Sequence, residues 1–175
     1  MAETSKTIVI MSDSHGDRVI VEEIKNRYLG KVDAIFHNGD SELDSQDPIW
    51  KDIQVVNGNC DYVGAYPEQL ITQIGDVTIA QTHGHFYGIN YSWQRLDYWA
   101  QEVMADICLY GHLHVPDATV RGKTLFLNPG SISQPRGVIR ECLYAIVTIR
   151  SDAFHIAYYN RQHELYEPLT KDIVR

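Results

Sequence analysis

The chain has 175 residues, 44% of them hydrophobic and 22% charged, which suits one domain with a substantial core and argues against wholesale disorder. It carries 15 Lys and Arg against 23 Asp and Glu, a formal net charge of −8. This acidic balance disfavours the binding of long nucleic acids, but a metal site can reverse the charge locally and attract a small phosphorylated substrate.

No segment has the features of a secretion signal or a membrane span. The first residues are polar and lead directly into a predicted strand, and no apolar run approaches the ~18 residues that cross a bilayer. The three cysteines, Cys60, Cys108 and Cys142, form no recognisable disulfide framework. We therefore expect a cytoplasmic protein with free thiols and no membrane contact, folded as a single domain over residues 1–175.

Strands and a helix alternate in the first half of the chain. Residues 7–11 are a short apolar run, typical of a buried strand. Residues 18–28 have apolar side chains at helical spacing with charges between them. Residues 32–37 and 53–57 predict two further strands, with a loop at 44–48 between them.

Strands dominate the second half. Residues 70–74 and 77–82 flank a Gly-Asp pair and predict a hairpin, and residues 93–105 predict an amphipathic helix. Further strands are predicted at 107–110, 124–127, 143–149 and 154–159. The polar segment 161–175 gives no clear pattern. The sum is an α/β domain with mixed sheets, richer in strands than a simple doubly wound fold.

Polar residues follow five of the predicted strands. The five segments are Asp13-Ser14-His15, Asn38-Gly39-Asp40, Gly58-Asn59-Cys60, His83-Gly84-His85 and Gly111-His112-Leu113-His114. If these strands are neighbours, their carboxyl ends bring the segments into one crevice. Carboxylate, amide and imidazole donors suit Mn²⁺, Fe, Zn²⁺, Co²⁺ or Ni²⁺, and the scarcity of thiolates disfavours a closed structural zinc site. The number of donors makes a pair of ions plausible, with a carboxylate bridging them.

In this order, the five segments resemble the motifs of the calcineurin-like metallophosphoesterase superfamily. The short length and the Asn128-Pro129-Gly130-Ser131 segment look most like its small bacterial and archaeal phosphodiesterase branch. The resemblance covers residues 8–136 and implies a four-layer αββα sandwich, in which helices flank two packed mixed sheets.

The resemblance also implies two divalent metal ions per chain, with Mn²⁺ expected first and Ni²⁺, Co²⁺, Zn²⁺ or Fe as alternatives. One ion would be held by Asp13, His15 and His114, the other by Asn59, His83 and His112, and both by Asp40. A hydroxide bridging the ions would attack phosphorus directly, and the residues implied in catalysis are Asn59, Cys60 and His83.

Cys60 departs from the pattern, because many family members have His at this position, where it is thought to protonate the leaving oxygen or hold a phosphate oxygen. A thiol is a poor cationic donor beside an imidazole. We hypothesise that Cys60 disfavours monoesters and leaves diesters as the preferred substrates.

Several other residues allow two interpretations. His85 either contacts substrate or supports a ligand from behind, and Arg136 either grips a phosphate oxygen or pairs with a surface acid. Asp61 either supports the site or forms a turn. The aromatic set Trp93, Tyr98 and Trp99 either belongs to the core or lines a nucleobase slot. We take His85 and Arg136 as the candidate substrate contacts.

The sequence is therefore interpreted as a metal-dependent phosphodiesterase acting on a small phosphodiester. A nuclease for short oligonucleotides or a cyclic nucleotide stays within this class. The alternatives outside it are a non-catalytic protein-interaction scaffold with the same fold and a di-iron redox protein, which usually has Glu-x-x-His pairs that this chain lacks. A homodimer is possible, since two-fold dimers are the commonest oligomers.

Overall fold

The strands of the chain form two mixed sheets, which the computed structural model describes over residues 4–175. Sheet A has the strand order β11-β10-β9-β1-β2-β3. Its members are β1 (Lys6–Met11), β2 (Ala34–His37), β3 (Gln54–Val55), β9 (Leu143–Ile149), β10 (Ala153–Asn160) and β11 (Lys171–Val174). The first three run parallel to one another, whereas β9, β10 and β11 each pair antiparallel with a neighbour.

Sheet B has the strand order β4-β5-β6-β8-β7. Its members are β4 (Gln69–Ile74), β5 (Val77–Thr82), β6 (Ile107–Leu109), β7 (Asp117–Arg121) and β8 (Thr124–Asn128). Three strands, β5, β6 and β8, are parallel, and the two edge strands are antiparallel to their neighbours. The hairpin predicted around Gly75-Asp76 is confirmed, since Ile74 pairs with Val77.

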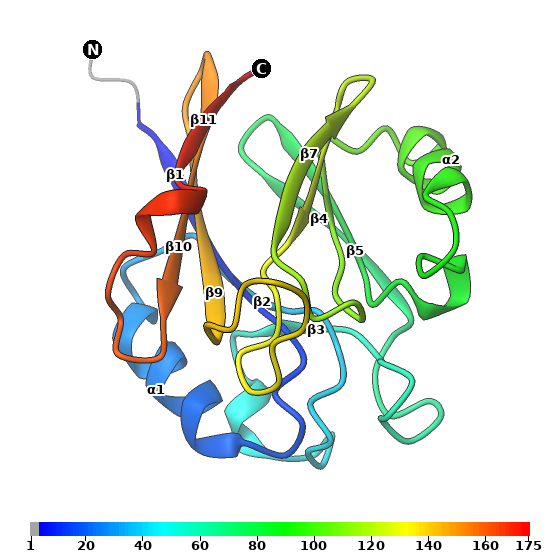
Figure 1. Cartoon of the computed structure of the whole chain (residues 1–175), viewed down its shortest axis with the longest axis vertical. Coiled ribbons are helices and arrows are strands. Elements are labelled where there is room, and N and C mark those ends of the chain that lie inside the picture. The colour runs from blue at the N-terminus through cyan, green and yellow to red at the C-terminus, as the bar shows by residue number, and fades with distance from the viewer. Residues whose placement is uncertain (1–3) are drawn as a thin grey trace.

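The two sheets pack face to face and each carries one helix on its outer face, as Figure 1 shows. β1 explains the arrangement, because Ile8 and Ile10 point into the core between the sheets while Val9 and Met11 meet α1 (Arg18–Tyr28). On the other side, α2 (Gln94–Glu102) packs Leu96 on sheet B. A strand buried on both faces must be apolar throughout. The predicted αββα order is therefore confirmed.

The strands that the sequence did not reveal lie at sheet edges. β7 buries only Ala118, and β11 is exposed except for the half-buried Ile173, so neither shows an apolar alternation. The helix predicted over 93–105 is also shorter, because Met104 has a φ of 54° that ends the helical conformation. Within residues 4–175, three 3₁₀ helices stand at Pro48–Trp50, His85–Tyr87 and Glu167–Leu169, and the first begins at the last residue of the loop predicted at 44–48.

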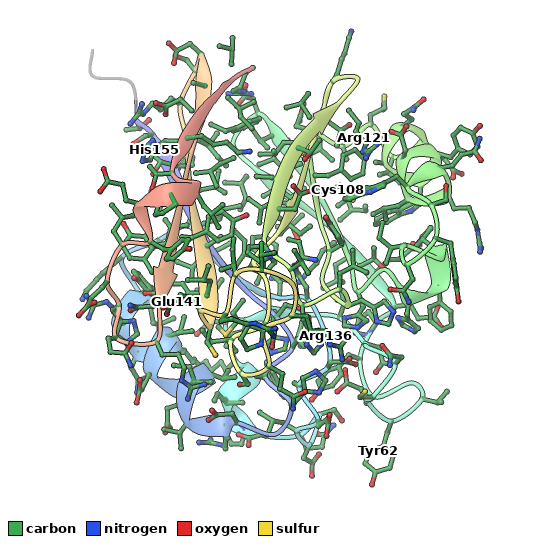
Figure 2. All side chains as sticks on the ribbon, in the orientation of Figure 1. Tyr62, Cys108, Arg121, Arg136, Glu141 and His155 are labelled. Atoms are coloured by element: carbon green, nitrogen blue, oxygen red, sulfur yellow. The ribbon has the colours of Figure 1, made fainter. Side chains whose placement is uncertain are left out.

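Two further observations concern the cysteines and the helices. All three cysteines are free thiols, with Cys108 buried in β6, Cys142 half-buried just before β9, and Cys60 exposed. Figure 2 shows Cys108 within the sheet B side of the molecule. Across residues 4–175, the helices are too short or too polar to traverse a bilayer.

Two buried polar side chains tie the sheets together. Gln81 on β5 donates through Nε2 to the carbonyl oxygens of His37 and Gln54, at 2.9 and 3.1 Å. Tyr158 on β10 is equally buried, and its hydroxyl lies 3.0 Å from the carbonyl oxygens of both Asp117 and Asn128. Such bonds satisfy polar atoms that the apolar interface would otherwise leave unpaired.

Replacing Tyr158 by Phe is expected to lower the free energy of unfolding by about 1 kcal/mol, because the ring stays but the shared hydrogen bond is lost. Urea denaturation measures this change. Tyr159→Phe is the matched control, since the Tyr159 hydroxyl has no hydrogen-bond partner within residues 4–175. Equal stabilities of the two variants would contradict this role of Tyr158.

Candidate metal centre

The five polar segments all follow the carboxyl ends of parallel strands, and their loops gather below the sheets in Figure 1. Asp13 follows β1, Asp40 follows β2, and Asn59 follows β3. In the other sheet, His83 follows β5 and His112 follows β6. The convergence expected from the sequence is therefore observed, with both sheets contributing to one cluster.

Asp13, His15 and His114 form the first part of the cluster. His114 Nε2 lies 3.1 Å from Asp13 Oδ1 and 3.1 Å from His15 Nε2. The other nitrogen of each ring is engaged elsewhere: His15 Nδ1 meets Glu42 Oε1 at 2.7 Å, and His114 Nδ1 meets the carbonyl oxygen of Gln134 at 2.6 Å. These acceptors require a proton on Nδ1, so each ring turns its Nε2 toward Asp13.

One oxygen of Asp13 has no hydrogen-bond partner in the described part of the chain. Oδ2 accepts from the Ser12 hydroxyl and from the backbone N–H of His112, whereas Oδ1 is buried and unpaired. A buried carboxylate oxygen without a partner is costly. Three acceptor atoms therefore meet with no donor between them, which is the arrangement that suits a cation.

His83, Asp40 and Asn59 repeat this arrangement. His83 Nδ1 donates to the carbonyl oxygen of Asn38 at 2.7 Å, so this nitrogen carries a proton and Nε2 faces the cluster. His83 Nε2 lies 3.2 Å from Asp40 Oδ2 and 3.1 Å from Asn59 Oδ1. The nitrogen lone pair and two oxygens again converge, so these residues also fit a metal ion.

His112 completes the second group, and Asp40 lies between the groups. One nitrogen of His112, one of His83 and one oxygen of Asp40 lie within 4.8 Å of one another. The His112 Nε2 is 3.1 Å from the amide nitrogen of Asn90. Asp40 Oδ2 is also 4.0 Å from His15 Nε2, so its carboxylate reaches toward both groups.

The electrostatics keep both carboxylates ionised. Burial raises the pKa of Asp13, but the neighbouring imidazoles of His83 and His114 outweigh it, and the pKa lies below its usual range. The pKa of Asp40 is lowered in the same way, chiefly by His83 against the effect of burial. Burial lowers the pKa of His83, but Asp13 and Asp40 raise it above its ordinary value. The two anions therefore favour positive charge at the centre.

Two glycines permit the close packing of these loops. A Cβ on Gly58 would overlap Asp40 Oδ1, and a Cβ on Gly111 would overlap the Ser12 hydroxyl. The loops also turn sharply: five of the residues with positive φ and a side chain belong to the cluster, namely Asp13, His15, Asp40, His112 and His114. Such a conformation costs roughly 1–2 kcal/mol for an L-residue, so the surrounding bonds must hold it in place.

Asp61 is the residue that holds two of these loops together. Its Oδ2 accepts from the backbone N–H of Asp40 at 2.9 Å and of Gly58 at 2.7 Å, and its Oδ1 accepts from that of Glu42 at 2.8 Å. Asp61 therefore supports the site rather than forming only a turn. Glu42, Asn90 and the carbonyl groups of Asn38 and Gln134, which orient the four histidines, carried no signal in the sequence.

The remaining candidates surround the cluster. The ring of His85 lies 5.3 Å from that of His83, and burial lowers the pKa of His85 to about 4. Arg136 is exposed, its backbone N–H donates to the carbonyl oxygen of His114, and within residues 4–175 no carboxylate pairs with it. Figure 2 shows Arg136 in the lower half of the view, where the loops gather. Burial raises the pKa of the Cys60 thiol to about 11.

The aromatic set does not reach the cluster as a unit. Trp99 is a buried residue of α2 itself, and Trp93 packs edge-on against Tyr110 and Phe126. Tyr98 is 60% exposed and accepts a hydrogen bond from Gln94. Trp93 and Trp99 thus pack in the core between α2 and sheet B. For these two of the three residues, the interpretation as core residues holds.

Comparison with known proteins identifies the family. The model of the calcineurin-like phosphoesterase superfamily domain matches residues 7–152, so the chain belongs to that superfamily. The probable metallophosphoesterase YsnB of Bacillus subtilis (strain 168) is 38% identical over 162 residues, which are 93% of this chain and 95% of YsnB. The chain is accordingly a phosphoesterase hydrolase.

Solved structures agree with this assignment. A predicted phosphoesterase of Streptococcus pneumoniae TIGR4 is 59% identical with a TM-score of 0.97, covering 99% of this chain and 100% of that one. The phosphoesterase Yfce of Escherichia coli shares the fold, with a TM-score of 0.67 at 18% identity over 95% of this chain and 98% of that one. A segment of 56 residues, 32% of this chain and 27% of the relative, is 41% identical to the protein named phosphodiesterase YfcE in strain K12.

Replacing Asp61 by Asn is expected to lower the free energy of unfolding by roughly 1–3 kcal/mol. Both carboxylate oxygens accept backbone N–H bonds, so either orientation of the amide turns its NH₂ toward a donor. Urea denaturation measures the loss, and Asp44→Asn is the control, since only one Asp44 oxygen accepts a backbone bond, from Gln46. A loss no larger than the control's would contradict the role of Asp61.

Proposed function

We propose that this phosphoesterase is a metal-dependent phosphodiesterase with a two-ion centre. The observation that carries the proposal is the convergence of carboxylate, amide and imidazole ligand atoms at two adjacent points that share Asp40. The family assignment and the name of the relative YfcE support the same reaction class.

The residues divide between the two ions by distance. Asp13, His15 and His114 would hold one ion, and Asn59, His83 and His112 the other, with Asp40 shared. Two such ions supply Lewis acidity and lower the pKa of water to about 7, which provides a nucleophile at neutral pH. We expect Mn²⁺ to serve, and imidazole with oxygen ligands also accepts Ni²⁺, Co²⁺, Zn²⁺ or Fe.

Three side chains around the cluster are proposed to meet the substrate. Arg136 is exposed beside His114 and is free to bind a phosphate oxygen through its guanidinium group. His85 is neutral at pH 7 and adjoins His83, so it offers a hydrogen bond rather than a charge. Cys60 follows the ligand Asn59 and, as a neutral thiol, gives little help to a poor leaving group.

The partners are proposed on the same physical grounds. A net charge of −8 favours a small phosphodiester, including a short or cyclic nucleotide, over a long nucleic acid. A homodimer in the cytoplasm, without membrane contact, is the expected setting.

Removal of divalent metal by a chelator should abolish hydrolysis of a chromogenic phosphodiester, and Mn²⁺ should restore it, with little turnover of the matching monoester. Asp40→Asn should lower the Mn²⁺-dependent rate at least ~100-fold, because it weakens the ligand that both ions share. Asp52→Asn is the control, since Asp52 is exposed and also has a positive φ, of 66°.

A protein that binds two ions but turns over no phosphoester with Mn²⁺, Ni²⁺, Co²⁺ or Zn²⁺ would contradict the proposal. The non-catalytic scaffold would then be the better account. A rate in Asp40→Asn equal to that of Asp52→Asn would show that Asp40 is not the shared ligand.

Cys60→His should raise the rate of monoester hydrolysis, because an imidazolium can protonate an alkoxide leaving group that a thiol leaves unassisted. We expect an increase of about tenfold or more. General acid catalysis typically contributes at least ~100-fold, so the expected increase is set below that range. The measurement is kcat/KM for the chromogenic monoester with Mn²⁺, with circular dichroism as the check on folding. A folded variant with an unchanged monoester rate would refute this explanation of the diester preference.

A further inference from the structure

Cys60 lies close enough to the candidate metal centre to act as a ligand itself. Its Sγ, a nitrogen of His15 and a carboxylate oxygen of Asp40 lie within 4.8 Å of one another. This group shares His15 with the first part of the cluster and Asp40 with both parts. Among the cysteines, Cys60 alone falls in such a group within residues 4–175.

The backbone fixes Cys60 in this place. Its N–H donates to Asp40 Oδ1 at 2.8 Å, so the residue is anchored to the shared carboxylate. The amide nitrogen of Asn59 lies 3.5 Å from Cys60 Sγ. The loop itself is held to Asp40 by Asp61, as described above. The sulfur therefore stays beside the centre without a change in loop conformation.

The chemistry of sulfur makes this position selective among ions. Thiolates bind soft or borderline ions such as Zn²⁺ and Cd²⁺ strongly, whereas Mn²⁺ prefers oxygen and nitrogen ligands. The remaining donors, carboxylate, amide and imidazole, accept either kind of ion. The identity of the metal thus decides whether the sulfur is used.

We propose that Cys60 is a conditional metal ligand, which joins the centre when a thiophilic ion occupies it and stays a free thiol beside Mn²⁺. The proposal rests on the proposed two-ion centre and adds a mode of regulation to it. When Cd²⁺ binds, the S–H bond breaks, an S–Cd bond forms and the proton passes to water, with no change of oxidation state. With a thiophilic ion, the sulfur of Cys60 would occupy a position beside Asp40. With Mn²⁺, that position would stay open to substrate.

The test is spectroscopic and does not depend on turnover. The metal-stripped protein is titrated with Cd²⁺ and the ultraviolet sulfur-to-cadmium charge-transfer band is recorded for wild type, Cys60→Ser and Cys142→Ser. We expect the band in wild type and in Cys142→Ser, and its loss in Cys60→Ser together with at least about tenfold weaker Cd²⁺ binding. The affinity for Mn²⁺, measured by calorimetry, should change far less.

A second readout uses the wild-type protein alone. Cd²⁺ should slow alkylation of the exposed Cys60 by iodoacetamide, located by mass spectrometry, whereas Mn²⁺ should not. A charge-transfer band that persists in Cys60→Ser, or a wild-type protein that binds Cd²⁺ without the band, would overturn the proposal. Neither result would bear on the proposed function, because Mn²⁺-dependent diester hydrolysis is measured separately, on wild-type protein with Mn²⁺ alone. Failure to bind both ions would contradict the metal centre itself.

Discussion

Two buried carboxylates and the imidazole nitrogens that converge on them impose the main constraint on this molecule. Asp13 Oδ1 is buried and unpaired, and the histidines around it turn their Nε2 atoms inward because their outer nitrogens are already bonded. Such a cluster is unfavourable unless positive charge is present. The fold, the loops and the chemistry are all consistent with the need to hold divalent ions at this point.

The two-sheet architecture brings the candidate metal-ligating residues together. Parallel strands in each sheet place their carboxyl ends at one edge, and the packing of sheet A on sheet B brings the loops after β1, β2 and β3 against those after β5 and β6. Gln81 and Tyr158 lock the sheets through buried hydrogen bonds. Asp61 and Ser131, whose hydroxyl donates to the carbonyl oxygen of Asp13, then fix individual loops. Precision in the cluster thus comes from bonds outside it.

Much of this arrangement could be predicted from the sequence, for identifiable reasons. The strand at 7–11 is predictable because both of its faces are buried, which leaves a continuous apolar run. The helix over 18–28 is predictable because its apolar side chains recur at helical spacing, and its observed bounds are Arg18–Tyr28. The edge strands β7 and β11 were missed because one-sided or weak burial leaves no pattern to recognise. The ligand candidates could be predicted because polar residues follow five of the predicted strands, in the order of the motifs that the chain resembles.

The residues behind the cluster could not be predicted in the same way. Glu42 and Asn90 touch the histidines only through loop geometry, and two of the other partners are backbone carbonyl groups, which any residue possesses. Asp61 was visible but ambiguous, because an Asp after Gly-Asn-Cys also suits a simple turn. The structure decides between the two roles, because the Asp61 carboxylate accepts hydrogen bonds from three backbone N–H groups of the neighbouring loops.

Anomalous diffraction from crystals of the Mn²⁺-loaded protein, recorded at the manganese absorption edge, tests the central claim most directly. The account predicts two peaks about 3.5–4 Å apart on either side of the Asp40 carboxylate, one beside Asp13 and the other beside His83. A single peak, or peaks bound to residues outside this cluster, would contradict it.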